Sequence, residues 1–227
     1  TKLVVDFGKS LGLETLTDKA GNVLIRKPAT PGMEDRKVIV LQAHLDMVPQ
    51  KNNSVKHDFE KDPIKTIVDG EWLRADQTTL GADNGIGVAS IMAVLESKNL
   101  KHGPIVALFT TDEETGMYGA FGLQPDWIKG DILLNLDSED EGELFIGCAG
   151  GLDASINWKF KPLPTAPDDI ALKVTVSGLK GGHSGLDIIL GRANANKLLF
   201  RFLKEAISSD EARLSEVEGG NMRNAIP

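Results

Sequence analysis

The sequence has very little cysteine: Cys148 is the one cysteine in 227 residues. A lone cysteine excludes an internal disulfide framework and favours a reducing compartment, for which the cytoplasm is the default. Positive charge is also scarce, since 25 lysines and arginines against 33 acidic residues give a formal net charge of −8. This acidic balance argues against nucleic acid and anionic membrane surfaces as partners. No apolar run approaches the length of a membrane span.

Signatures of nucleotide binding are missing as well. The glycines of residues 81–87 do not form the dinucleotide-binding fingerprint, and no Gly-Lys-Ser/Thr follows them. No internal repeat is visible, which argues against a solenoid. The composition that remains, 41% hydrophobic and 26% charged, is ordinary for a globular protein with a sizeable core.

The first 150 residues predict an α/β domain. Short apolar runs rich in β-branched residues indicate buried strands of a mainly parallel sheet at 38–44, 105–110 and 132–136. Helical spacing predicts helices at 3–11 and 85–96, and a polar turn predicts a hairpin over 13–17 and 22–26. Between them, residues 50–80 are polar and irregular, with short strand candidates at 66–68 and 72–75.

A different pattern begins near residue 150. Apolar and polar residues alternate at 156–160 and 172–176, which predicts half-solvated strands. A helix is expected over 193–207 and a further strand at 214–217. We therefore predict two domains, an α/β domain over 1–150 and an incomplete α+β domain over 151–227.

His44 and Asp46 stand at the end of the first predicted parallel strand. Side chains at i and i+2 of an extended chain share a face, so both can project from the strand's carboxyl end, where open α/β sheets bind ligands. A carboxylate commonly holds a metal-bound imidazole in its tautomer and orientation. The alternative is a polar strand end with a locally paired histidine.

Four further acids follow strands or precede a helix in the same half of the chain: Asp83, Glu113, Glu114 and Asp137. Singly, each has a structural explanation, as a helix N-cap, a solvated turn or a polar strand end. Together with His44 they would converge on one rim of a parallel sheet and repel one another unless cations neutralised them. Imidazole with carboxylates suits zinc, manganese or cobalt, so the sequence predicts a metal centre.

Five segments together resemble the co-catalytic zinc exopeptidases, the family of aminoacylases, carnosinases and glutamate carboxypeptidases. They are residues 43–48, 81–85, 113–114, 135–139 and 181–185. The resemblance implies a catalytic domain over 1–150 and the first part of a lid and dimerisation domain over 151–227. It also implies a cytoplasmic homodimer, paired through the lid, that hydrolyses the peptide bond of dipeptides, including Xaa-His dipeptides.

The resemblance implies two divalent metal ions, most simply zinc, with cobalt or manganese as alternatives. His44 and Asp137 would bind one ion and Glu114 the other, with Asp83 bridging both. Two such ions make hydroxide available near neutral pH and polarise the scissile carbonyl.

Three further residues receive catalytic roles from the resemblance. Asp46 would steady the His44 ring, and Glu113 would act as general base and then as general acid. His183, in the glycine-rich segment 181–185, would help to hold substrate and stabilise the oxyanion at the partner subunit's site. Read without the resemblance, that segment is a flexible turn.

Two departures from the family pattern stand out. The family's second metal takes a histidine from a distal part of the catalytic domain, and this chain does not supply it; we expect a segment of a longer protein, with weak activity alone. The dipeptidase pattern also prefers glycine at the position of Gln77. Alternative functions are a related amidohydrolase that removes acyl groups from amino acids and a non-catalytic metal-binding or dimerisation module.

Overall fold

The computed structural model divides into two compact units, Thr1–Gly151 and Leu152–Pro227. The predicted boundary after residue 150 lies one residue from this division. The helices it describes are all too short or too polar to cross a membrane. The described residues are 1–52, 54–138, 140–148, 150–152, 154–209, 212–220, 222 and 225–227.

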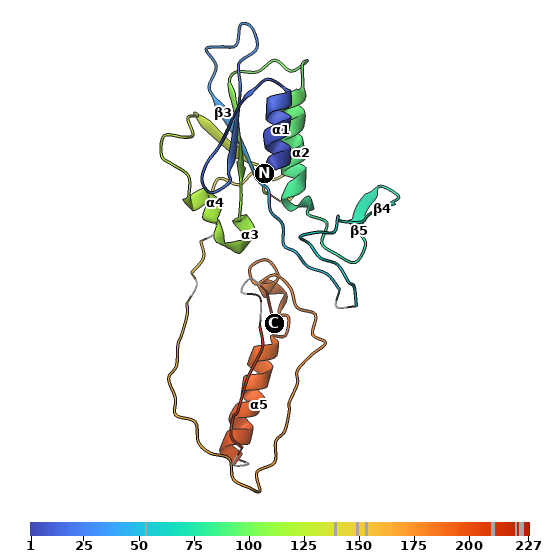
Figure 1. The fold of residues 1–227 in the computed structure, drawn as a ribbon, viewed down its shortest axis with the longest axis vertical. Helices are drawn as coiled ribbons and strands as arrows, with labels where there is room; N and C mark the ends of the chain where they lie inside the picture. Colours follow the sequence, from blue (N-terminus) through green and yellow to red (C-terminus); the bar gives the residue numbers. More distant parts are fainter. Residues whose placement is uncertain are drawn as a thin grey trace. The chain divides into compact units, whose positions relative to one another are not determined.

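A five-stranded mixed sheet forms the centre of the first unit (Figure 1). Its strands, in spatial order, are β1 (Glu14–Thr17), β2 (Val23–Lys27), β6 (Ile105–Thr110), β3 (Ile39–His44) and β7 (Ile132–Asn135). The β1–β2 hairpin joins β6 antiparallel, whereas β6, β3 and β7 are parallel. This confirms the predicted α/β class, and the pairing of His44 with Thr110 brings the carboxyl ends of β3 and β6 to one rim.

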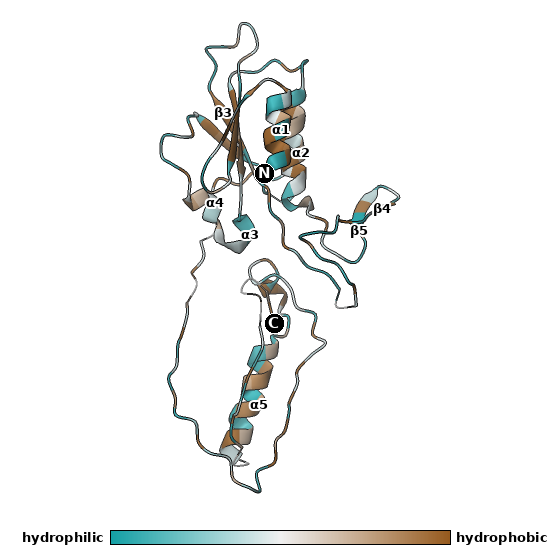
Figure 2. Ribbon diagram, viewed as in Figure 1, coloured by the Kyte–Doolittle hydropathy of each residue, from teal (hydrophilic) through white to brown (hydrophobic). Residues whose placement is uncertain are grey.

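Two helices, α1 (Lys2–Ser10) and α2 (Ala82–Glu96), pack on one face of the sheet (Figure 1). Their apolar residues meet the sheet in a buried cluster that contains Val4 of α1, Ile91 and Leu95 of α2, and Phe109 of β6. Figure 2 shows hydrophobic residues, in brown, along the strands of the five-stranded sheet. Burial of one face agrees with the helical spacing at 3–11. In α2 the agreement is partial, because Ile91 and Leu95 are buried whereas Ile86 is exposed.

The opposite face of the sheet carries a second buried cluster made of Leu24, Val40, Val106 and Leu108. Two short helices, α3 (Glu113–Gly116) and α4 (Tyr118–Phe121), follow β6. The segment beyond them covers this face in part, through Leu123, Trp127 and Ile128. At the edge, all four residues of β7 are exposed. Because α3 follows β6 closely in the chain, it starts directly beyond the rim at which β6 ends.

A separate antiparallel hairpin, β4 (Thr66–Asp69) and β5 (Trp72–Ala75), lies within the polar stretch 50–80. Both strands occur where the sequence predicts them. Just after β5, Gln77 has a φ of +62°, a left-handed conformation that favours glycine. The family's preference for glycine there therefore has a backbone reason.

The described residues of the second unit contain two helical elements, η1 (Ile188–Leu190) and α5 (Ala195–Ser209). The helix predicted at 193–207 is confirmed as α5. The prediction of strands at 156–160, 172–176 and 214–217 is wrong. Among the described residues of this unit, the one β-bridge joins His183 and Ala225. An alternating segment becomes a strand only when a neighbouring strand supplies hydrogen bonds, and here Ile156, Trp158 and Phe160 stay about 80% exposed.

Candidate metal centre

His44 ends β3 and is buried, with 1% of its surface exposed. Its Nδ1 lies 2.9 Å from the backbone oxygen of Asp46. A carbonyl oxygen only accepts hydrogen bonds, so Nδ1 is the nitrogen that donates. The other nitrogen, Nε2, faces the carboxylates of Asp83 at 3.0 Å and Asp137 at 3.4 Å. In the neutral ring Nε2 therefore carries the lone pair, on the side where the acids gather.

The Asp46 carboxylate connects the end of β3 to the start of α3. Its two oxygens accept the backbone N–H groups of Glu113 and Glu114, both at 3.1 Å. One of these oxygens also lies 3.4 Å from Nδ1 of His44. Asp46 thus fixes the glutamate pair as well as the imidazole.

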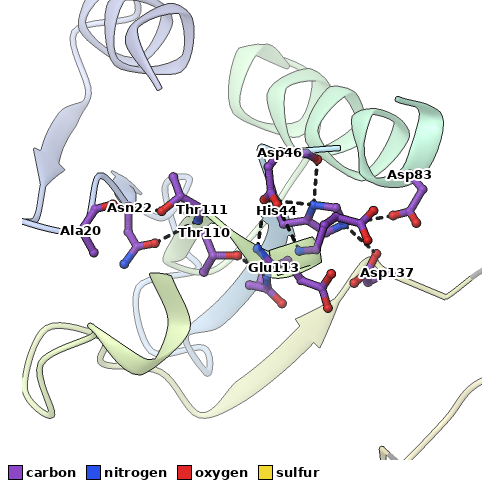
Figure 3. A network of polar contacts seen from close by, with 11 residues as sticks. Ala20, Asn22, His44, Asp46, Asp83, Thr110, Thr111, Glu113 and Asp137 are labelled. Atoms are coloured by element: carbon purple, nitrogen blue, oxygen red, sulfur yellow. Dashed lines mark hydrogen bonds and ion pairs between the residues drawn. The ribbon is translucent and has the colours of Figure 1, made fainter. Parts of the chain in front are cut away.

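Asp83 and Asp137 reach the site from two other elements (Figure 3). Gly81, at φ +78°, turns the chain into α2, and the torsions of Asp83 and Asn84 are not yet helical. The helix becomes regular at Gly85, where the sequence predicts it to begin, and Asp83 is left beside His44 rather than on the helix surface. Asp137 follows β7, and its backbone N–H donates to the Asn135 side chain at 3.1 Å.

The adjacent glutamates lie between two residues with left-handed backbone torsions. Asp112, before them, has a φ of +55°, and Met117, after them, has a φ of +58°. Both turns fold α3 back over the rim, so that each glutamate is partly buried. Among the described residues, ligand atoms of His44, Glu113 and Glu114 lie within 4.8 Å of one another, as do those of His44, Asp83 and Asp137.

The acids shift the titration of the imidazole. Burial alone would lower the pKa of His44, but hydrogen bonds and attraction from Asp137, Asp83 and Asp46 outweigh it and raise that pKa to about 10. The hydrogen bond from His44 lowers the pKa of Asp137 in turn. Burial raises the pKa of Glu113 and of Glu114, and neighbouring carboxylates add to the rise.

This donor set fits divalent metal ions. One imidazole nitrogen and carboxylates from three elements are within reach of one another, and the carboxylates outnumber the cationic groups around them. Nitrogen with oxygen ligands and no thiolate suits zinc, manganese or cobalt. Because the Asp46 carbonyl oxygen keeps the ring proton on Nδ1, the lone pair of Nε2 faces the carboxylates, where a metal ion would bind.

The structure brings together six of the seven predicted residues: His44, Asp46, Asp83, Glu113, Glu114 and Asp137. His183 belongs to the second unit. Its Nδ1 accepts the backbone N–H groups of Gly185 at 3.1 Å and Leu186 at 3.0 Å. Because Nδ1 is an acceptor, the neutral ring carries its proton on Nε2 and presents a hydrogen-bond donor.

Asn22 is a residue of this neighbourhood that the motifs did not indicate. It follows the hairpin turn, is completely buried, and accepts the backbone N–H of Thr111 at 3.1 Å (Figure 3). The only local signal is an asparagine after a turn glycine, which is common in exposed turns. Its burial depends on contacts with residues about ninety positions away.

Comparison with known proteins gives a family match. The model of "Peptidase family M28" matches residues 22–159. This range contains every residue of the cluster around His44.

Curated relatives and solved structures agree with this match. The chain is 55% identical to the cytosol non-specific dipeptidase of Escherichia coli over 99% of its own length and 46% of the relative's. It is 50% identical to the crystal structure of an aminoacylhistidine dipeptidase from Vibrio alginolyticus, with a TM-score of 0.65, over 100% of this chain and 46% of that one. These matches confirm the resemblance found in the sequence, and the chain spans about half the length of both relatives.

A more distant structure shares only the fold. The aminopeptidase PepT from Bacillus cereus is 21% identical, with a TM-score of 0.51, over 99% of this chain and 57% of its own. The mixed α/β architecture thus extends beyond the dipeptidases.

Proposed function

The chain belongs to peptidase family M28, and we propose that it is part of a metal-dependent peptidase that cleaves dipeptides, including Xaa-His dipeptides. The observation that carries the proposal is the meeting of His44 with acids from three elements at one rim of the sheet. The names of two relatives, a non-specific dipeptidase and an aminoacylhistidine dipeptidase, support this substrate class. The name of the first also supports a cytoplasmic location.

We propose that His44, Asp83, Asp137 and Glu114 hold two divalent ions, with zinc as the first choice. His44 and Asp137 would hold one ion and Glu114 the other, and Asp83 would bridge them. When bound, such ions lower the pKa of water and polarise a carbonyl group. The backbone oxygen of Asp46 keeps the ring proton of His44 on Nδ1, which leaves the lone pair of Nε2 to bind the ion.

Glu113 is the proposed general base. Its backbone is held by Asp46, and its carboxylate lies in the same group of donors as His44 and Glu114. From there it takes a proton from the attacking water and returns it to the departing amine. The adjacent glutamates thus divide their tasks, Glu114 holding a cation and Glu113 moving a proton.

His183 is proposed as a donor that holds substrate and stabilises the oxyanion. The two backbone N–H groups on its Nδ1 leave Nε2–H as the donor, which is the form that this task requires. We further propose a homodimer formed through residues 151–227, in which His183 serves the partner subunit. Exposed Trp158, Phe160 and Leu172 in this unit support such an interface, because each is more than 80% exposed.

The alternatives have less support. A related amidohydrolase would cleave acyl groups from amino acids, but two relatives carry dipeptidase names. A non-catalytic metal-binding module would have no need of Glu113, which is present within the donor group.

Replacing Glu113 tests the proposal. In the complete protein that carries this chain, Glu113→Gln should lower kcat for dipeptides by ~10²–10⁴-fold, because the proton acceptor is lost. Metal content, measured by elemental analysis, should stay the same. The matched control is Glu71→Gln in the exposed turn between β4 and β5, which should leave kcat unchanged. Undiminished dipeptide hydrolysis by Glu113→Gln would show that another group is the base.

A further inference from the structure

Asn22 is a buried amide whose polar atoms all have partners. Its side-chain oxygen accepts the N–H of Thr111 at 3.1 Å, and its side-chain nitrogen donates to the Gly119 carbonyl oxygen at 2.8 Å and to the Asp18 carboxylate at 2.7 Å. No part of its surface is exposed. A fully satisfied buried amide specifies one geometry, since any displacement leaves polar atoms without partners.

The two backbone partners of Asn22 are the two ends of one segment. Residues 111–119 leave the sheet after β6 and contain α3, with Glu113 and Glu114 in its first turn. The ends also bind each other, since the Gly119 N–H donates to the Thr111 carbonyl oxygen at 3.1 Å. One side chain from the β1–β2 hairpin therefore closes the base of the segment that carries both glutamates.

Space at this junction is fully used. A Cβ at position 119 would collide with the Thr111 carbonyl oxygen and with the side-chain oxygen of Asn22. Glycine is thus required at Gly119 for close approach, even though the residue lies in a short helix. The Asn22 side chain and the backbone of the segment are therefore closely packed, with no room for a larger residue at position 119.

The segment needs such support because its own backbone is strained. Asp112 and Met117 flank α3 with φ values of +55° and +58°, which are sparsely populated for residues other than glycine. Strained torsions persist only where surrounding contacts determine them. At the other side Asp46 holds the amides of Glu113 and Glu114, so Asn22 and Asp46 fix the segment at two places.

We propose that Asn22 is a positioning residue of the metal centre, which acts through Thr111 and Gly119 to keep Glu113 and Glu114 at the rim. It contacts neither glutamate among the hydrogen bonds of the described residues. The proposal deepens the proposed function and rests on it for the tasks of the two glutamates. The position of the segment itself can be measured without metal.

The first measurement is amide hydrogen exchange on the metal-free chain. Asn22→Ala should lower the protection of the Thr111, Glu113 and Glu114 amides at least ~10-fold, while amides of β3 and α1 keep theirs. Gly119→Ala opens the same junction from its other side, without deleting Asn22, and should have the same effect. Ile25→Ala is the control, because Ile25 is a buried core residue of β2 outside these contacts. Unchanged protection of the segment in both junction variants would overturn the proposal.

The second measurement is the Zn²⁺ affinity of the complete protein that carries this chain, by titration calorimetry at a temperature at which every variant is folded. Asn22→Ala and Gly119→Ala should each weaken binding ~10–100-fold, the range for residues that orient metal ligands. Ile25→Ala should stay within ~2-fold even if it destabilises the fold more. Equal weakening in Ile25→Ala would reduce Asn22 to a general structural role and overturn the proposal.

A double-mutant cycle locates the effect. If Asn22 acts through the glutamates, Asn22→Ala should weaken Zn²⁺ binding much less in a Glu114→Gln background than alone. Additive losses would contradict that route. Failure of the complete wild-type protein to bind Zn²⁺ would count against the proposed function, and hydrogen exchange would then decide the role of Asn22 independently.

Discussion

At the scale of single residues, a main-chain atom sets the orientation of the His44 ring. The Asp46 carbonyl oxygen binds Nδ1 at 2.9 Å, while the nearest carboxylate oxygen of Asp46 is 3.4 Å away. The carboxylate instead accepts the amides of Glu113 and Glu114. The sequence predicts that His44 and Asp46 act together, and the structure adds that Asp46 reaches the glutamates as well.

Gln77 provides a prediction about backbone conformation. Its φ of +62° costs a side chain with a Cβ roughly 1 kcal/mol or more, of which glycine would recover about 0.5–1 kcal/mol after its greater loss of entropy. Gln77→Gly should therefore raise the free energy of unfolding by that amount, as measured by urea denaturation. Gln77→Ala keeps the Cβ and should give no gain. Equal stabilities of the two variants would mean that the turn is not strained.

At the scale of elements, two segments that carry site residues are held by contacts away from the site. The segment 111–119 is held by Asn22, and α2, which begins beside Asp83, is held at its far end by Lys27 of β2. The Lys27 ammonium donates to the carbonyl oxygens of Val94 at 2.9 Å and Ser97 at 2.7 Å. These are among the last carbonyls of a helix, which lack partners within it.

Lys27→Met should destabilise the protein by about 1–2 kcal/mol, because it removes two hydrogen bonds from a charged donor at a helix C-terminus. The methionine keeps most of the aliphatic stem, so packing changes little. Urea unfolding measures the loss, with the exposed Lys101→Met as a control expected to stay within ~0.5 kcal/mol. A loss no larger than that of the control would show that water replaces the lysine.

At the scale of the whole molecule, the chain joins a well-packed α/β unit to a second unit with many exposed apolar side chains. Nearly all of the buried hydrophobic residues belong to the first unit, and Ile226 is the one from the second among those described. The first unit therefore has the core that a rigid metal centre requires. The apolar side chains of the second unit, among the described residues, remain largely exposed.

Zinc should stabilise the chain through the acidic cluster. At a free Zn²⁺ concentration of 100 times the dissociation constant, the folded state gains about 2.7 kcal/mol. For a protein of this size that is a rise in Tm of roughly 5–10 °C, which calorimetry can measure and a chelator should reverse. Asp83→Ala should remove most of the shift, since Asp83 belongs to the donor group. An undiminished shift in that variant would place the bound zinc elsewhere.

The isolated chain should hydrolyse dipeptides poorly. The family resemblance assigns to the second ion a histidine that this chain does not contain, so one ion would be weakly held. We expect turnover of an Xaa-His dipeptide at saturating Zn²⁺ to lie at least ~100-fold below that of a complete relative. Comparable turnover would contradict the argument from the missing ligand.

The sequence by itself determined the strands and the two longer helices of the first unit, and it predicted which side chains gather at the rim of the sheet. Apolar runs and helical spacing are local, so the parallel strands and α2 could be predicted without contacts. The rim followed from a general property of parallel sheets, which places strand ends such as His44 and Asp137 together. The same local signal failed at 156–160 and 172–176, because alternation records a preference for a strand and not the presence of its neighbour.

The tertiary structure alone decided the order of the strands, the tautomer of His44 and the use of Asn22. The tautomer of His44 depends on the local path that brings the Asp46 carbonyl oxygen to Nδ1. The strand order and the use of Asn22 depend instead on residues far apart in the chain, as when Asn22 binds Thr111 across 89 positions. Local patterns contain no information about such distant partners, and an asparagine after a turn has the same appearance whether it is exposed or buried. Only the packing of the hairpin against the strand that leads to Glu113 makes it part of the site.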